Sequence, residues 1–369
     1  MESVLFSTLA SSKDKQIGIA TLNAEKSLNA LSLEMVITLA AQLTRWQHDE
    51  QIAAVMIDSV GDKAFCAGGD VRALYQAQQQ QPGRYVPLAQ QFFEAEYRLD
   101  YQIHTFGKPV LVWGDGIVMG GGMGVLMGAS HRVVTERSRL AMPEVTIGLY
   151  PDVGGTYFLS RMQGKTGLFL GLTAYNLTAA DARYTGIANH FLASSEKQRL
   201  LHALTSITWG DNHSLNKQKL HDVLDELEVS STEHVGKSRL KANQAIIENL
   251  MAGRLPDIVV RMQQLDSSEA WLQQARSSML AGSPQSWLLA YAQCQLGREM
   301  SLAECFRFEL GLSVNCCAIG DFCEGVRALL VDKDRMPKWA YGTEQLPPDE
   351  QLHALLKSPF AGNHPLADL

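Results

Sequence analysis

The chain has 369 residues, of which 46% are hydrophobic and 19% charged, a composition typical of a folded globular protein and not of a disordered one. Its formal net charge of −7 argues against a nucleic-acid-binding surface, because such surfaces are rich in lysine and arginine. The six cysteines show no CxxC spacing, which indicates reduced thiols and a cytoplasmic location, and the first residues lack the pattern of a secretory signal.

The first half of the chain alternates between strand and helix patterns. Strands are predicted at 4–9, 16–22, 52–57, 108–113 and 132–135, and helices at 32–47, 71–80, 88–105, from the glycine cluster to about 129, at 154–162 and from 178 onward. Residues 61–70 are expected to form a loop. This alternation is typical of right-handed βαβ crossovers and of a largely parallel sheet.

One stretch of this half, 110–129, resembles a membrane span because it is nearly uncharged and has glycines at every fourth position of its second half. However, it contains Asp115, and its glycine-dense middle would make a poor helix. The pattern therefore favours a buried segment of a globular protein, and no membrane association is predicted.

From residue 195 onward strand patterns nearly vanish and helical patterns dominate. Helices are predicted at 217–227, 238–250, 284–299, 302–314 and 322–330. Ser283 is the expected N-cap of the third of these helices, with Pro284 in its first turn, where a missing N–H costs nothing. The sequence therefore predicts two domains, an α/β core at 1–195 and a mainly helical region at 196–369 that packs on it.

Two glycine-rich loops each follow a strand pattern and precede a helix pattern. The first contains Gly69 and the second Gly121. Either loop alone is adequately explained as a strand-to-helix turn, with Asp70 near the start of the helix that follows the first loop. Two backbone N–H groups without side chains, converging on one oxygen, are what an oxyanion hole requires.

Two carboxylates follow the second loop. Glu144 lies among apolar residues, which would raise its pKa toward the working pH, and Asp152 follows Pro151 eight residues later. Taken alone, a residue such as Glu144 is more often a helix-cap or surface carboxylate, and Asp152 could simply cap the helix near Gly154. Beside an oxyanion hole, the two become candidates for a tuned acid or base.

Other patterns fail as functional motifs. The ten histidines are scattered without ligand spacing, so no metal site is predicted. The segment 164–166 reads Gly-Lys-Thr, but Leu159 stands where a phosphate-binding P-loop needs glycine. Cys66 has no histidine near it in sequence to activate it, so it is expected to be a small packed residue.

Four segments together resemble the crotonase (enoyl-CoA hydratase/isomerase) superfamily, and within it the 3-hydroxyisobutyryl-CoA hydrolase branch. They are FCAGGD at 65–70, GIVMGGGMG at 116–124, AMPEVTIGLYPDVGGTYFLSR at 141–161 and DFCEGVRALLVDKDRMPKW at 321–339. The resemblance covers nearly the whole chain. It implies an α/β fold with a crotonase-like ββα spiral core, which holds the coenzyme A and catalytic sites, followed by a helical C-terminal region.

The resemblance also implies roles for individual residues. The backbone N–H groups of Gly69 and Gly121 would form the oxyanion hole for a thioester carbonyl. Glu144 would be the catalytic carboxylate, acting as a nucleophile through a mixed anhydride or as a general base for water. Asp152, the second carboxylate of the hydrolase branch, and Glu96, a substrate-contacting glutamate, would hold the substrate's 3-hydroxyl or the attacking water.

The implied substrate is a short, branched 3-hydroxyacyl-CoA, (S)-3-hydroxyisobutyryl-CoA in valine breakdown, and its hydrolysis needs no metal and no cofactor, coenzyme A being part of the substrate. The groove for the adenine and pantetheine would be formed by the main chain of Lys26, Ser27, Leu28, Ala67 and Gly68, with Arg72 assisting at the phosphates. Relatives often assemble as trimers or pairs of trimers, so a homo-oligomer is left open.

One departure from the family pattern is informative. Hydratases carry a first glutamate two residues beyond the glycine triplet, where this chain has Gly124. Adding water to a double bond would need that partner, whereas thioester hydrolysis needs only a polarised carbonyl and one activating carboxylate. Two alternatives remain: a hydratase or isomerase of a short branched enoyl-CoA in which Asp152 replaces the missing glutamate, and a catalytically silent structural relative.

Overall fold

The computed structural model describes residues 2–11 and 14–369. The chain forms two compact units. The first comprises Met1–Gly69, Leu99–Leu140 and Leu177–Lys241, and the second comprises Asp70–Arg98, Ala141–Asn176 and Ala242–Leu369. The predicted boundary after residue 195 falls inside the first unit, so the compact units do not coincide with the predicted domains.

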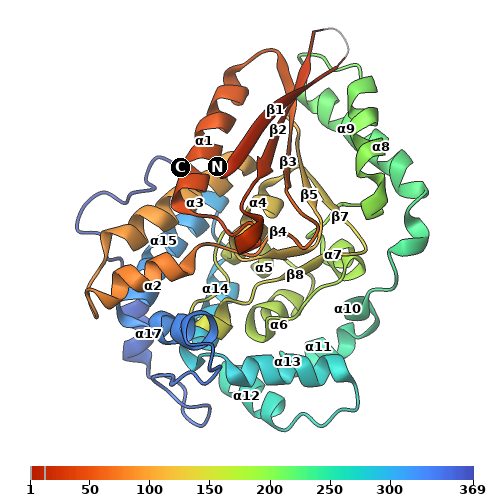
Figure 1. Cartoon of the computed structure of the whole chain (residues 1–369). Helices are drawn as coiled ribbons and strands as arrows, with labels where there is room; N and C mark the ends of the chain where they lie inside the picture. The colour runs from red at the N-terminus through yellow and green to blue at the C-terminus, as the bar shows by residue number, and fades with distance from the viewer. Residues whose placement is uncertain (1, 12–13) are drawn as a thin grey trace. The chain divides into compact units, whose positions relative to one another are not determined.

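The first unit contains a six-stranded sheet in the order β1-β2-β3-β5-β7-β9 (Figure 1). Its strands are β1 Val4–Ala10, β2 Gln16–Leu22, β3 Ile52–Ser59, β5 Val110–Gly114, β7 His131–Val134 and β9 His190–Phe191. β1 pairs antiparallel with β2, and the other neighbours pair in parallel. The predicted parallel sheet is confirmed, and β3 is buried along nearly its whole length because both of its faces are covered.

Helices cover both faces of this sheet. On one face, α8 Lys197–Ser206 and α9 His213–Val229 pack against the strands through one apolar cluster, which includes Ile17, Met56, Leu111, Val133, Leu200, Leu204, Leu220 and Leu224. Because Gly18 follows Ile17, it points to the opposite face, where a Cβ atom would lie 2.7 Å from the ring of Trp46 on α1, Leu33–His48. Ser32 caps α1 as predicted, accepting a hydrogen bond from Met35 N.

A second, three-stranded sheet of the order β4-β6-β8 corrects the prediction for residues 61–70. That segment contains β4, Ala64–Cys66, in addition to loop residues. β4 pairs with β6, Ile117–Met119, and β8, Arg139–Ala141, lies on the other side of β6. Strands of three residues carry too little alternation to be recognised from sequence. The first unit also contains the helices α4, Gly121–Gly128, and α7, Ala179–Thr185. Two further helices, α3 Pro87–His104 and α10 Arg239–Ala242, have residues in both units.

The second unit is built mainly from helices. They are α2 Val71–Gln79, α5 Gly155–Ser160, α6 Thr166–Thr173, α11 Gln244–Leu250, α12 Leu255–Gln263, α13 Ala270–Ala281, α14 Pro284–Leu296, α15 Leu302–Ile319, α16 Phe322–Val326 and α17 Asp349–Leu356. Two predicted helices are interrupted. The helix at 238–250 breaks at Asn243, a residue with low helix propensity, and the one at 322–330 continues after α16 as a π-helical turn, Arg327–Val331.

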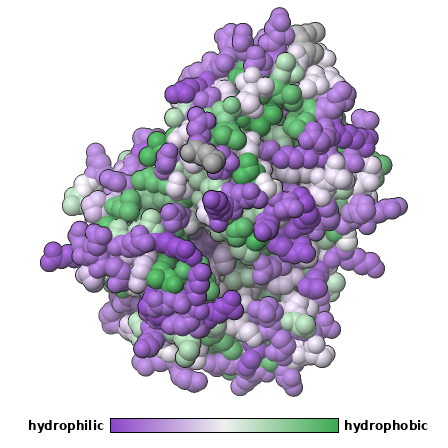
Figure 2. All heavy atoms as spheres, in the orientation of Figure 1, coloured by the Kyte–Doolittle hydropathy of each residue, from purple (hydrophilic) through white to green (hydrophobic). Residues whose placement is uncertain are grey.

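Hydrophilic side chains cover most of the face of the molecule in Figure 2, with hydrophobic ones scattered between them. No helix of the described residues is both long enough and apolar enough to cross a bilayer. The membrane-like stretch at 110–129 is instead divided between β5, β6 and α4.

Gly148 ends the 3-10 turn that begins at Glu144, and we expect its replacement by alanine to lower the free energy of unfolding by about 2–4 kcal/mol. Its φ is +71°, and a Cβ atom there would lie 2.4 Å from the carbonyl group of Asp321. Gly186 is a matched control, since its φ is +75° but nothing lies within 4 Å of an added Cβ. Urea denaturation should show a clearly smaller loss for Gly186→Ala, and equal losses would contradict the close packing at Gly148.

Candidate active site

The two predicted oxyanion loops begin at paired strands of the first unit. β4 and β6 run parallel, with Cys66 opposite Val118, and Gly69 and Gly121 are each the third residue after these partners. Both glycines therefore follow the same edge of the small sheet. The loops can approach closely because residue 122 is glycine, where a Cβ atom would lie 2.5 Å from the carbonyl oxygen of Cys66.

The N–H groups of both glycines are available for a ligand. Gly121 is the first residue of α4, where a helix supplies no acceptor for the N–H. Within residues 2–11 and 14–369, neither Gly69 nor Gly121 donates its amide to another group of the protein. The sheet thus brings together two backbone donors that lie more than fifty positions apart in sequence.

The main chain predicted to hold coenzyme A also comes together in the first unit. Ala67 N donates to the carbonyl oxygen of Leu28 at 3.0 Å, and Gly68 O accepts from Leu31 N at 2.8 Å. Lys26 and Ser27 are exposed in the 3-10 turn that precedes Leu28. Arg72 is an exposed residue of α2 in the second unit.

The three predicted carboxylates lie together in the second unit. Glu96 comes from α3, Glu144 opens the 3-10 turn Glu144–Ile147, and Asp152 precedes α5; their relative exposures are 2%, 3% and 4%. Burial, and then the charge of Asp152, raise the pKa of both Glu144 and Glu96 well above the ordinary value. Burial also raises the pKa of Asp152 to about 6, against a hydrogen bond from Tyr97 that lowers it.

Such a cluster cannot carry three charges at neutral pH, because like charges in a low-dielectric site disfavour one another. Glu144 and Glu96 each keep one buried carboxyl oxygen without a hydrogen-bond partner in the described part of the chain. These unpartnered oxygens are suited to accept a substrate hydroxyl or a water. The arrangement supports acid–base or nucleophilic chemistry at Glu144.

Sequence reasoning missed the hydrogen-bond network that holds Asp152. The Tyr97 hydroxyl donates to Asp152 Oδ2 at 2.7 Å and lies 2.6 Å from Ser313 Oγ. Ser313 Oγ is also 2.8 Å from the hydroxyl of Tyr150, which donates to the carbonyl oxygen of Glu309 at 2.8 Å. All five residues are buried.

The side chain that caps α5 is Glu309, and not Asp152 as one interpretation of the sequence suggested. Its carboxylate accepts hydrogen bonds from Gly154 N and Thr156 N, both at 2.8 Å, at the start of α5. Asp152 contributes only its backbone oxygen, which accepts from Gly155 N at 2.7 Å, so its side chain is left to Tyr97. The reading of Asp152 as a side-chain cap is therefore wrong. A signal existed in the sequence, since Glu309 directly precedes the uncharged stretch 310–320.

Known proteins are similar to this chain over most of its length. The sequence matches the Enoyl-CoA hydratase/isomerase family over residues 17–356. The chain belongs to this family. Among curated members, it is 41% identical to the 3-hydroxyisobutyryl-CoA hydrolase, mitochondrial, of Danio rerio over 328 residues, covering 88% of this chain and 83% of that one. It is 36% identical to the protein of the same name from Homo sapiens over 342 residues, covering 92% and 86%.

Solved structures of the family confirm the predicted crotonase fold. The crystal structure of an enoyl-CoA hydratase from Rhodobacter sphaeroides 2.4.1 superposes with a TM-score of 0.83 at 31% identity, covering 97% of this chain and 98% of that one. A carnitinyl-CoA dehydratase from Mycobacterium thermoresistibile gives the same TM-score and identity, covering 98% of each chain.

Gly124 occupies the position where hydratases of the family carry their first glutamate. A Cβ atom at Gly124 would lie 2.5 Å from Oδ2 of Asp100, a fully buried residue of α3. A glutamate could not be accommodated there unless Asp100 moved. In this member of the family, packing against Asp100 in the first unit therefore disfavours the first hydratase glutamate at this position.

The tyrosines of the Asp152 network offer a matched pair of substitutions. We expect Tyr97→Phe to lower kcat/KM several-fold, because it removes the hydrogen bond that lowers the pKa of Asp152. The loss should be larger near pH 6 than near pH 8, since more of Asp152 is then protonated. Tyr150→Phe should cost similar stability, about 1–3 kcal/mol, with little effect on the pH profile. If the pH profiles of kcat/KM were identical for the two variants, Tyr97 would have no role in positioning Asp152.

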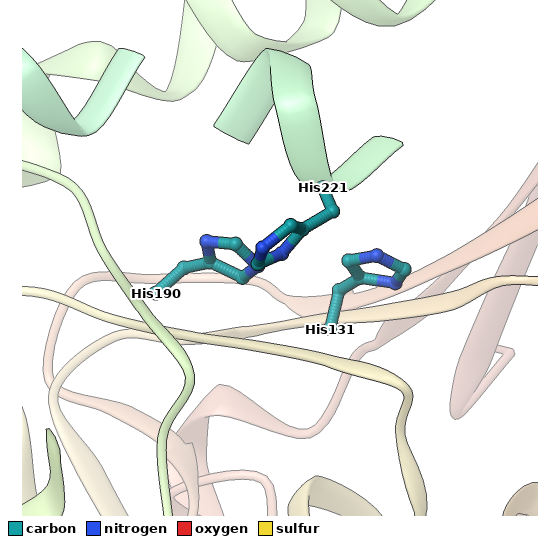
Figure 3. A group of neighbouring side chains, drawn as sticks. All are labelled: His131, His190 and His221. Carbon is teal, nitrogen blue, oxygen red and sulfur yellow. The ribbon is translucent and has the colours of Figure 1, made fainter. Parts of the chain in front are cut away.

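The structure also brings together residues that could hold a metal ion, contrary to the prediction from histidine spacing. One ring nitrogen from each of His131, His190 and His221 lies within 4.8 Å of the others (Figure 3). They come from β7, β9 and α9 of the first unit, which are distant in sequence.

Proposed function

We propose that this chain hydrolyses the thioester bond of a short, branched 3-hydroxyacyl-CoA, with (S)-3-hydroxyisobutyryl-CoA as its substrate in valine breakdown. The observation that carries the proposal is the cluster of three buried carboxylates around Glu144, with glycine in place of the first hydratase glutamate at position 124. The names of the curated relatives, 36–41% identical over most of their length, support the same reaction.

In the proposed reaction the amides of Gly69 and Gly121 hold the thioester oxygen and stabilise the negative charge that develops on it, each by about 3–4 kcal/mol in the transition state. Ionised Glu144 then acts in one of two ways. It attacks the carbonyl carbon, so that coenzyme A leaves as the thiolate and water cleaves the resulting anhydride, or it removes a proton from a water that attacks directly. Both routes yield the free acid and coenzyme A.

Asp152 and Glu96 position the substrate in this proposal. Asp152, held by Tyr97, accepts a hydrogen bond from the 3-hydroxyl group, and the unpartnered oxygen of Glu96 accepts a second one from that hydroxyl or from water. A charged acceptor favours substrates with the hydroxyl by about 1.5–3 kcal/mol over those without it. The main chain of 26–28 and 67–68, with Arg72, binds the coenzyme A moiety.

The test is release of free thiol from a panel of coenzyme A esters. We expect the fastest release from 3-hydroxyisobutyryl-CoA and much slower release from isobutyryl-CoA, which lacks the hydroxyl. A hydratase would consume the double bond of methacrylyl-CoA without releasing thiol, and that outcome would replace the proposal by the alternative. Absence of turnover with every ester would support a silent structural relative.

The proposal extends to the compartment and the assembly of the protein. All six cysteines are free and five are buried, which is compatible with the reducing cytoplasm, whereas the animal relatives are named as mitochondrial. The sequence leaves the assembly state open, and light scattering of the purified protein decides between a single chain and a homo-oligomer.

A further inference from the structure

Three histidines of the first unit, outside the site described above, form a cluster on one side of the six-stranded sheet. His131 begins β7 and His190 begins β9, which are neighbouring parallel strands, and His221 lies on α9 above them (Figure 3). The rings of His131 and His190 stack with centroids 5.7 Å apart, and His221 meets His190 edge-on at 4.8 Å. His131 and His190 are buried, while the side chain of His221 is 45% exposed.

The ring nitrogens are spaced like ligands of one ion. His190 Nε2 and His221 Nδ1 are 3.1 Å apart and share a hydrogen bond, which an ion would replace, and one nitrogen from each of the three rings lies within 4.8 Å of the others. In a tetrahedral zinc site, bonds of about 2.0–2.1 Å place two ligand nitrogens about 3.4 Å apart. The widest separation, up to 4.8 Å, exceeds this value, so the rings must move closer together when an ion binds.

A polar side chain lies near the opposite nitrogen of each ring, although His190 Nδ1 makes no hydrogen bond within the described residues. Asp225 reaches two of them, with Oδ1 3.4 Å from His190 Nδ1 and Oδ2 3.4 Å from His221 Nε2. Ser130 Oγ lies 2.9 Å from His131 Nδ1. Metal-binding histidines are commonly oriented by a carboxylate or hydroxyl group at the nitrogen that does not bind the ion, and Asp225 and Ser130 are placed for this role.

The remaining neighbours can be accounted for. His131 Nε2 lies 3.1 Å from Lys217 O, and binding an ion through Nε2 would replace that hydrogen bond. Glu228 lies 3.8 Å from His190 Nδ1, but its Oε2 already accepts hydrogen bonds from Arg183 and from Phe191 N. We therefore assign no ligand role to Glu228, whose charge offsets that of Arg183.

From this arrangement we propose that His131, His190 and His221 bind one divalent transition-metal ion, with Asp225 and Ser130 orienting the rings. Three imidazole ligands select ions such as Zn²⁺, Ni²⁺ or Cu²⁺ over Mg²⁺ and Ca²⁺, which prefer oxygen. The half-exposed His221 provides the route of entry, and a fourth ligand position is left for water. The ion would join β7, β9 and α9, and the proposal is independent of the hydrolase reaction.

The test is calorimetric titration of the chelator-treated full-length protein with Zn²⁺, followed by thermal unfolding at saturation. We expect one ion per chain and a higher Tm, because a ligand that binds only the native state stabilises it. His221→Ala should abolish saturable binding without unfolding the protein, since its ring is half exposed. Asp225→Asn, which removes an outer partner only, should weaken binding about 10–100-fold.

His213→Ala is the matched control, because His213 is an exposed histidine at the start of the same helix and outside the cluster. It should bind Zn²⁺ as the unchanged protein does. Absence of saturable binding to the unchanged protein would overturn the proposal. Binding that survives His221→Ala, or that His213→Ala reduces equally, would identify adventitious surface coordination and would also overturn it.

Discussion

Replacement of Glu144 by glutamine is expected to lower kcat by about two to four orders of magnitude while coenzyme A binding stays largely intact. Glutamine has nearly the same shape as glutamate, but its amide can neither attack a carbonyl carbon nor accept a proton from water at neutral pH. The residues predicted to contact coenzyme A lie elsewhere in the sequence. Thiol release at saturating substrate measures kcat, and titration with coenzyme A measures its Kd.

Glu94→Gln is the control for this experiment. Glu94 lies on α3 like Glu96, but its partly exposed carboxylate pairs with Arg98 and does not belong to the buried cluster. Its neutralisation should change kcat by less than about twofold, because such an exposed pair contributes little. If the Glu144→Gln variant turned over at a near-normal rate, Glu144 would have no part in the mechanism.

Replacement of Asp152 by asparagine should lower kcat about 10–100-fold, the cost of replacing a charged hydrogen-bond acceptor by a neutral one. It should also move the acid limb of the kcat/KM profile to lower pH. After burial, the charge of Asp152 is the next largest cause of the raised pKa of Glu144. When this charge is absent, Glu144 loses its proton at a lower pH, although burial still keeps its pKa above the ordinary value.

The pH dependence of kcat/KM for the free enzyme checks this expectation, because it reports the ionisation of the essential base. The fold should be preserved, since Tyr97 can donate to the amide oxygen of an asparagine as it does to Asp152. A shift of the acid limb to higher pH, or no shift, would show that Asp152 and Glu144 do not interact electrostatically as the structure indicates.

The fold could be predicted from sequence wherever a local pattern was long enough. Ser32 and the apolar positions of α1 identified that helix, and the continuous apolar run at 52–57 identified β3 as a doubly covered strand. β4 and β6 were missed because three residues carry no usable periodicity. Their parallel pairing is nevertheless what brings Gly69 and Gly121 to one edge.

The candidate site could be predicted only in part. Its carboxylates and glycines stand in recognisable segments, so resemblance to the family found them. Tyr97, Glu309 and Ser313 were missed because their roles depend on hydrogen bonds between α3, α15 and the Asp152 loop, up to 216 positions apart. The cluster of His131, His190 and His221 was missed because these residues are far apart in sequence and meet only where α9 packs on β7 and β9.

The most direct test is a crystal structure of the Glu144→Gln variant with 3-hydroxyisobutyryl-CoA bound. We expect the thioester oxygen to accept hydrogen bonds of about 2.7–3.1 Å from the amides of Gly69 and Gly121. Residue 144 should lie next to the carbonyl carbon, and the 3-hydroxyl should contact Asp152 or Glu96. An acyl group bound away from these carboxylates, or a thioester oxygen that contacts neither amide, would contradict the proposed mechanism.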